Sequence, residues 1–388
     1  MLFNRFPKVS PNSMKARIIL AFLTTAGLFY VNIMPTIVSG LIEALGFSNQ
    51  QAGNIASSNM YGAATGALFI VFLIKRLNWQ WVSVVLLTAL IAIDLYSTSL
   101  SDPATLLVVR FIHGFTGGML VGTGFSLIAR THEPDRTFGV LLFVQFGLGG
   151  LGIMFIPGLV PEYGTQVLFY SLIAFSVVTF LMLPFLPDYA VPEKKKVQSS
   201  GSGIQWTSLA LTLATIFLFQ AANMGLFAFI IGLGEFYKLE MGFITTTLGI
   251  ANWLGLAGAG LVIAIGSRFG YLKSILAGIV FTAIGIWMLL YSNVPWIWIV
   301  SNCLIGITWG FTISYLLGLA SRFDESGQMA AMGGFASKMG LASGPAITAM
   351  LLGKDNYELI IIIATIVMLL AAVTIWVPAK LQDRIKTD

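Results

Sequence analysis

Three charged side chains, Asp94, Arg110 and Lys338, lie within long stretches of apolar sequence, and His113 joins them as a titratable group. A charged side chain at the centre of a membrane-spanning helix costs about 2.5–3.5 kcal/mol, so it is rare unless it pairs or serves a function. These four residues are therefore the first candidates for proton binding and substrate binding.

Asp94 precedes the turn at Pro103, and Arg110 follows it. At about 1.5 Å of rise per residue, both lie about 10 Å deep on neighbouring antiparallel helices, where they can pair. Such a pair is either a structural tie between the helices or a switch that responds to protons or substrate. His113 comes three residues after Arg110 and shares its side of the helix, where a histidine either changes charge near neutral pH or simply packs.

Lys338 lies close to the middle of its apolar stretch, and no acidic residue occurs at matching depth in the second half of the chain. From there its stem does not easily carry the ammonium to either membrane surface. The residue predicts a water-filled cavity with contact to substrate or coupling ion, or else pairing with carbonyls or with amides such as Asn252 or Asn302.

Uncharged polar and aromatic side chains follow helical spacing on several other apolar stretches. In a lipid setting such amides also join helices, at about 0.6 kcal/mol for an average hydrogen bond. With Arg110 and Lys338, the residues that we expect to line a substrate cavity are Asn32, Tyr61, Gln145, Gln220, Asn223, Asn252, Trp253, Asn302 and Trp309.

The surrounding elements follow from composition. Charged residues make up 10% of the chain and apolar residues 57%, whereas a soluble domain has about 25% charged residues. Every backbone polar group in a bilayer must be satisfied within its own segment, so the chain is predicted to be an all-α membrane protein. Twelve stretches have the length of about 20 residues that a span needs: 17–40, 51–74, 79–99, 104–129, 138–160, 166–186, 208–234, 244–267, 273–292, 295–320, 329–352 and 356–379.

The second six stretches repeat the first six at a constant offset. Arg130 matches Arg322, and Gly114 matches Gly306. A constant offset indicates two copies of one six-helix unit, the arrangement of secondary transporters whose substrate site lies between the copies. The sequence predicts an N-terminal bundle over 1–186, a cytoplasmic linker over 187–207 and a C-terminal bundle over 208–388.

Basic residues predict the orientation. With both termini on the cytoplasmic side, that side holds 17 of the 21 Lys and Arg residues and the opposite side holds Lys238 and Lys354. This asymmetry over short loops is the positive-inside pattern. It accounts for the net charge of +5 without a nucleic-acid partner, and the absence of an Asn-x-Ser/Thr sequence favours a bacterial inner membrane.

Three short motifs resemble those of the major facilitator superfamily. The segment from Arg110 to Gly114 resembles its Arg-x-x-x-Gly pattern in the fourth helix. The loop from Gly266 to Lys273 is similar to its Asp-Arg-x-Gly-Arg-Lys loop, with Ser267 in place of the aspartate, and Gly340-x-x-x-Gly344-Pro345 resembles a pattern of exporters.

The resemblance implies twelve transmembrane helices in two pseudo-symmetric six-helix bundles. It also implies that the arginine matching Arg110 takes part in proton coupling, with Asp94 and His113 beside it. The loop arginines that we expect to stabilise one conformation are Arg76, Arg268, Arg130 and Arg322. Span five lacks the Gly-Pro pair of many exporters, which weakens an antiporter assignment.

The sequence contains no arrangement of residues for covalent catalysis. It has two histidines and one cysteine, no metal-ligand spacing and no phosphate-binding glycine loop after a strand. We therefore expect no enzyme activity and no cofactor, and transport powered by a gradient rather than by ATP.

The predicted function is a proton-coupled secondary transporter of a small organic anion or polar zwitterion, working by alternating access. The cavity-forming spans contain Arg110, His113 and Lys338 but no carboxylate, which favours a negatively charged or zwitterionic substrate. The alternative is a proton-driven efflux pump for drug-like or lipophilic compounds, with Asp94 and Arg110 as the relay. A minor alternative is a receptor or scaffold without flux. The expected partners are the substrate, protons and the lipid bilayer, with a monomeric chain.

Overall fold

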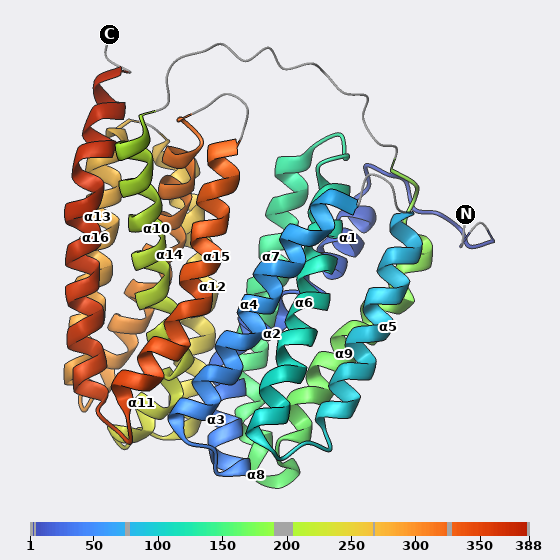
Figure 1. The fold of residues 1–388 in the computed structure, drawn as a ribbon, viewed down its shortest axis with the longest axis horizontal. Helices are drawn as coiled ribbons and strands as arrows, with labels where there is room; N and C mark the ends of the chain where they lie inside the picture. Colours follow the sequence, from blue (N-terminus) through green and yellow to red (C-terminus); the bar gives the residue numbers. More distant parts are fainter. Residues whose placement is uncertain are drawn as a thin grey trace. The chain divides into compact units, whose positions relative to one another are not determined.

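The computed structural model of the chain describes residues 3, 5–73, 78–189, 205–266, 268–323 and 328–385 (Figure 1). All the regular secondary structure of these residues is helical, as expected for segments that must satisfy their own backbone hydrogen bonds in lipid. Contacts divide the chain into two compact units, unit 1 from Met1–Lys194 and unit 2 from Lys195–Asp388. Most of the predicted linker, 190–204, lies outside the described residues.

Unit 1 contains nine α-helices and two short 3-10 turns among its described residues. They are α1 (Met14–Ala26), α2 (Phe29–Asn32), α3 (Met34–Leu45), α4 (Asn49–Leu73), α5 (Trp79–Ser97), α6 (Pro103–Ile128), α7 (Pro134–Phe155), η1 (Pro157–Leu159), α8 (Val160–Tyr163), α9 (Gln166–Met182) and η2 (Leu183–Phe185).

Unit 2 contains seven α-helices and one 3-10 turn among its described residues. They are α10 (Trp206–Ala228), α11 (Ile230–Phe236), α12 (Met241–Ile265), α13 (Gly270–Met288), η3 (Leu289–Tyr291), α14 (Pro295–Ala320), α15 (Gln328–Leu352) and α16 (Tyr357–Ile385).

The first predicted span, 17–40, is not one continuous helix. It is divided among α1, α2 and α3, with interruptions at Gly27 and Ile33. Pro35 has no N–H to donate, and its ring clashes with the carbonyl four residues earlier in a continuous helix, which explains the second interruption. The seventh predicted span is likewise divided, into α10 and α11 at Phe229.

Nine helices in the described part of the chain have the length and apolar composition needed to cross a membrane. The other three predicted spans correspond to the divided α1–α3 segment and to α4 and α15. Polar residues cluster at the start of α4, from Asn49 to Asn54, and mid-α15 contains Ser337 and Lys338. These polar side chains lower the hydropathy of helices that are long enough to span.

Glycines bring two helices of unit 1 into backbone contact. A Cβ atom added at Gly66, Gly114 or Gly118 would collide with the backbone of the facing helix in the α4–α6 pair. In membranes, small residues allow such close approach and the van der Waals packing that holds helices together. Figure 1 shows α4 and α6 running alongside each other.

Glycines at the equivalent positions bring two helices of unit 2 into close contact. Gly258, Gly306 and Gly310 bring α12 and α14 into the same close contact, and a Cβ at any of them would meet backbone atoms of the other helix. These are the glycines that match Gly66, Gly114 and Gly118 in the sequence repeat. The repeat therefore conserves a packing interface within each unit.

Candidate functional site

A buried ion pair joins α5 and α6 in unit 1. Arg110 Nη1 donates to Asp94 Oδ1 at 2.8 Å, and both residues are 0% exposed. Arg110 Nη2 also donates to the Ser97 hydroxyl and, at 3.4 Å, to the Ile93 carbonyl. The guanidinium therefore binds the last two turns of α5 through its charge and through its planar array of donors.

A third helix covers the guanidinium. The Arg110 Cζ atom lies 5.0 Å from the ring centroid of Phe169 on α9, and Phe169 is buried. This cation–π geometry is favourable where water is excluded. Arg110 thus connects α5, α6 and α9.

His113 lies on the other side of the carboxylate. Its Nε2 is 3.3 Å from Asp94 Oδ2, close enough for electrostatic attraction. The direction of approach is not that of a hydrogen bond, and Asp94 Oδ2 and Arg110 Nε are buried without hydrogen-bond partners among the described residues. The cluster therefore keeps an oxygen lone pair and an N–H group that a bound proton or water could use.

Asn59 on α4 is a fourth member of this cluster and was not predicted from the sequence. Its Nδ2 lies 3.0 Å from the Arg110 carbonyl oxygen and 2.8 Å from His113 Nδ1, and Asn59 is buried. An amide inside an apolar stretch is a usable signal, but among the residues of this stretch only Tyr61 was predicted to line the cavity. Ser97 also had a signal, one helical turn after Asp94, whereas nothing in the sequence marked Phe169.

Asn32 and Gln145, both predicted to line the substrate site, contact each other. Gln145 Nε2 donates to Asn32 Oδ1 at 3.0 Å, and Asn32 Nδ2 donates to the Gln145 carbonyl at 3.3 Å. Asn32 ends α2, where the interrupted helix leaves backbone groups that need partners. The pair links this interruption to α7.

Three helices of unit 2 are joined by a second polar cluster. Trp309 Nε1 on α14 donates to Gln220 Oε1, and Gln220 Nε2 on α10 donates to Ser337 Oγ on α15, both at 2.8 Å. The amide of Gln220 is thus used at both ends, and Gln220 is buried. We refer to Gln220, Trp309 and Ser337 as the unit 2 triad.

Lys338 follows Ser337 directly on α15 and is partly buried. No hydrogen bond or ion pair joins its ammonium to another residue in the part of the chain that the structure describes. An ammonium in a partly buried, largely apolar setting lacks the hydration it has in water and favours an anionic contact. Lys338 therefore places a positive charge, without a partner among the described residues, one position after the Ser337 of the unit 2 triad.

The remaining candidates are distributed over both units. Asn223 Nδ2 and Asn302 Nδ2 donate to carbonyls one turn earlier in their own helices, at 2.8 and 2.9 Å, and Asn223 Oδ1 is buried without a partner among the described residues. Tyr61 and Asn252 are partly buried and Trp253 is 39% exposed.

The predicted conformational arginines differ in their surroundings. Arg130 donates to Ser126 Oγ at 3.0 Å and to the Tyr189 carbonyl at 3.3 Å, and Arg322 Nε donates to the Tyr271 hydroxyl at 3.3 Å. Arg268 is exposed. Arg76 lies outside the described residues.

An acidic residue takes a comparable position in each unit. Trp79 Nε1, at the start of α5, donates to Asp188 at 3.1 Å. In unit 2 the backbone N–H of Tyr271, at the start of α13, donates to Asp383 at 2.7 Å, and that of Leu272 donates to it at 3.0 Å. Asp383 thus places a negative charge at a helix N-terminus, where it is stabilised. In unit 1 the start of α5 is thus tied to the segment that follows η2. In unit 2 the start of α13 is tied to the end of α16.

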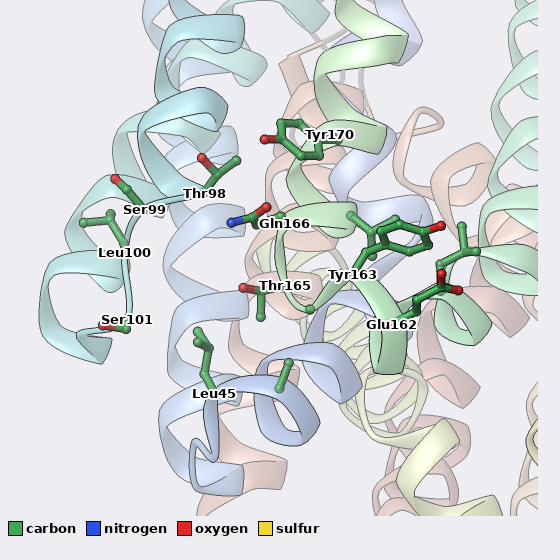
Figure 2. Close-up of a pocket in the computed structure, with 14 residues that line it drawn as sticks. Leu45, Thr98, Ser99, Leu100, Ser101, Glu162, Tyr163, Thr165, Gln166 and Tyr170 are labelled. Carbon is green, nitrogen blue, oxygen red and sulfur yellow. The ribbon is translucent and has the colours of Figure 1, made fainter.

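A pocket of about 880 Å³ opens at one end of unit 1 (Figure 2). The α5–α6 turn, including Thr98, lies on one side of it, with Thr165, Gln166 and Tyr170 from the start of α9 on another. The Thr98 N–H donates to the Asp94 carbonyl at 3.2 Å. The pocket is therefore one helical turn, about 5.4 Å, from Asp94 along α5.

Among the described residues, no group of three or more His, Cys, Asp and Glu side chains could hold a metal ion. The two clusters instead present hydrogen-bonding groups and single charges, which suit binding and proton exchange. A family model described as Major Facilitator Superfamily matches residues 18–337. The chain belongs to this superfamily.

Membership makes the chain a multi-pass membrane transporter rather than an enzyme. No curated protein matches its sequence. Solved structures that are similar in fold include two transporters. A variant of the nucleoside transporter NupG has a TM-score of 0.78 at 16% identity and covers 94% of this chain and 100% of its own. A D-xylose-proton symporter has a TM-score of 0.74 at 12% identity, covering 93% and 97%.

These likenesses show the fold alone, since the identities are so low. They confirm the predicted all-α membrane fold of twelve transmembrane helices in two pseudo-symmetric six-helix bundles.

Proposed function

We propose that this protein is a proton-coupled secondary active transporter that moves a small organic anion or polar zwitterion by alternating access. The observation that carries the substrate class is Lys338, a partly buried ammonium with no anionic partner among the described residues. A carboxylate of the substrate would compensate that charge, and charge-assisted hydrogen bonds are the stronger ones.

The unit 2 triad supports recognition of a polar group close to Lys338. Ser337 is the residue adjacent to Lys338, and its hydroxyl is oriented by Gln220, which is in turn held by Trp309. A side chain held on both sides loses little conformational freedom when a ligand binds, which favours affinity. The indole supplies apolar surface for the rest of the substrate.

Proton coupling is supported by the Asp94, Arg110 and His113 cluster. Asp94 is a carboxylate without exposure, held by an arginine and close to a histidine, and its Oδ2 has no hydrogen-bond partner among the described residues. One of the similar structures is a D-xylose-proton symporter. On this proposal, proton binding at the cluster and substrate binding in unit 2 bias the same conformational equilibrium.

We also propose that the protein is a monomer in a bacterial inner membrane with both termini cytoplasmic. The positive-inside asymmetry of its basic residues supports this orientation. The basic N-terminal segment and the segment after α9 lie together in unit 1: Lys8 Nζ donates to the Pro184 carbonyl at 2.7 Å.

Binding to three versions of the protein tests the substrate class. Organic acids and zwitterions, with lipophilic cations for comparison, are screened by thermal shift on wild type, Lys338→Ala and Lys338→Arg. A hydrogen bond to a charged group contributes about 1.5–3 kcal/mol, so Lys338→Ala should weaken anion binding by about ten- to a hundredfold. Lys338→Arg should retain part of the binding.

Lys354→Ala is the matched control, because it removes the same charge from an exposed position just beyond the same helix. It should leave anion binding unchanged. Equal binding of organic acids by all four proteins would end the anion hypothesis. Stabilisation by lipophilic cations alone would favour the efflux pump, and uptake into proteoliposomes with an imposed pH gradient would then measure direction.

A further inference from the structure

The orientation of the Asn59 amide is decided by one of its two partners. The Arg110 carbonyl oxygen can only accept a hydrogen bond, so the Asn59 atom that lies 3.0 Å from it must be the NH2 nitrogen. The opposite orientation would put two acceptor oxygens against each other. The same nitrogen lies 2.8 Å from His113 Nδ1.

This orientation fixes the protonation of the imidazole. Since Asn59 donates to Nδ1, that nitrogen must carry a lone pair, and the ring proton of a neutral His113 is on Nε2. Nε2 is the atom that lies 3.3 Å from Asp94 Oδ2. A proton added to Nδ1 would face the Asn59 NH2 group, donor against donor.

Relieving that conflict is difficult within this packing. Rotating the amide would lose the hydrogen bond to Arg110 and bring Asn59 Oδ1 against the carbonyl oxygen. Moving α4 away from α6 would lose the close packing between the two helices. They are so close that a Cβ on Gly114 would meet the Asn59 backbone. The other titratable or charged groups facing His113 are Asp94, Arg110 and Tyr30, whose ring centroid is 5.7 Å from that of His113.

We infer that Asn59 is a positioning residue that keeps His113 neutral with its proton on Nε2, so that the cluster takes up its proton on Asp94. This rests on the proposed proton coupling. The incoming proton bonds to a lone pair of Asp94 Oδ2, which has no hydrogen-bond partner among the described residues, and turns the carboxylate into a carboxylic acid. No other bond is made or broken, and Arg110 keeps its charge and loses its anionic partner.

The consequence is a division of roles. Asp94 is the proton-binding group, His113 stays neutral with Nε2 3.3 Å from Asp94 Oδ2, and Asn59 selects between the two. Loss of the anionic partner weakens the hold of Arg110 on α5, because the Coulomb attraction between the guanidinium and the carboxylate is lost. Proton binding would thereby loosen α5 from α6.

Nitrogen-15 spectroscopy of labelled histidine tests the tautomer directly. The chain has two histidines, and His132 is exposed outside the cluster, so His132→Gln leaves His113 as the only imidazole. At neutral pH we expect one protonated ring nitrogen, assigned to Nε2, and one unprotonated nitrogen, assigned to Nδ1. A proton on Nδ1 in this protein would overturn the inference.

Variants of Asn59 in the His132→Gln background supply the second arm. Asn59→Leu removes the donor and should give a mixture of tautomers, and Asn59→Asp replaces the donor with acceptors and should give a ring protonated on both nitrogens. Asn59→Ser is smaller and keeps the protein testable if the others fail to fold; it should also lose the single tautomer. Asn54→Leu, on the same helix, should behave as wild type.

Proton uptake by the purified protein separates the inference from the proposed function. Asp94→Asn should abolish the uptake assigned to the cluster, while His113→Gln, which keeps a neutral polar side chain beside Asp94, should lower it without abolishing it. The reverse result, uptake lost in His113→Gln and kept in Asp94→Asn, would overturn the division of roles. The expected tautomer and uptake without proton-driven flux in proteoliposomes would instead refute the proposed coupling and leave Asn59 in its role.

Discussion

Asp94 and Arg110 bind each other at 2.8 Å with neither residue exposed. Removing one charge of such a pair leaves the other buried and unpaired, which costs about 3–5 kcal/mol. We expect Arg110→Met to lower the stability of the folded protein by about this amount. The measurement is unfolding in detergent, by heat or by denaturant.

The double variant Asp94→Leu with Arg110→Met should recover a large part of that loss, because replacing both charges leaves no unpaired charge. Asp102, an exposed residue that caps α6, is a suitable comparison: Asp102→Asn should have a small effect. A double variant that loses more free energy of unfolding than the two single variants lose together would contradict pairing of the two side chains.

Close helix packing in unit 1 makes Gly114 sensitive to one added methyl group. A Cβ there would collide with the Asn59 backbone, and overpacking of this kind costs about 1–3 kcal/mol. We expect Gly114→Ala to lower the midpoint of thermal unfolding, and Gly306→Ala to do so through the equivalent contact with Ala251 in unit 2. Gly139→Ala and Gly260→Ala are matched controls, since a Cβ at either position meets nothing within 4 Å.

The ion pair of Glu133 makes the stability of the protein depend on pH, at a site outside the membrane-spanning segments. Its carboxylate forms a hydrogen-bonded ion pair with Arg17 and lies 3.5 Å from Arg136, and the hydrogen bond from Arg17, followed by the nearby positive charges, lowers the pKa of Glu133 from 4.5. A carboxyl whose pKa is lowered by folding contributes stability above its unfolded pKa. That contribution is lost as the pH falls below 4.5 and through the lowered pKa of the folded protein.

Glu133→Gln should therefore lose less stability than wild type as the pH falls below about 5. The difference between the two pH profiles should correspond to the binding of about one proton. The measurement is the unfolding midpoint as a function of pH. Glu162→Gln is the control, because Glu162 is an exposed acid for which no ion pair is found among the described residues. An identical acid profile for wild type and Glu133→Gln would contradict the assignment.

Cysteine labelling tests the proposed orientation and the pocket of Figure 2. Cys303 is the only cysteine, so Cys303→Ser provides a background for single additions. Thr98→Cys, which lines the pocket, should react with a membrane-impermeant thiol reagent added outside intact cells. His132→Cys should react only in inverted vesicles, and the opposite pattern would reverse the topology.

The sequence determined the fold class, the membrane-spanning segments and their repeat. Long apolar stretches in a chain with few charges predict membrane helices, and a constant offset indicates a duplication. It also placed Asp94 and Arg110 at one depth on helices joined by a short turn, so their proximity followed from rise per residue alone. The interruption of the first span was missed, although Pro35 was a visible signal for it.

The tertiary structure decided which faces of non-neighbouring helices meet. Gln220, Trp309 and Ser337 come from three helices, and their hydrogen bonds depend on how each helix is rotated about its axis. Asn59 meets His113 because glycines let α4 and α6 approach to backbone contact. Periodicity gives the depth of a side chain and the face it shares, but packing against the other helices sets the rotation and distance that turn these residues into a site.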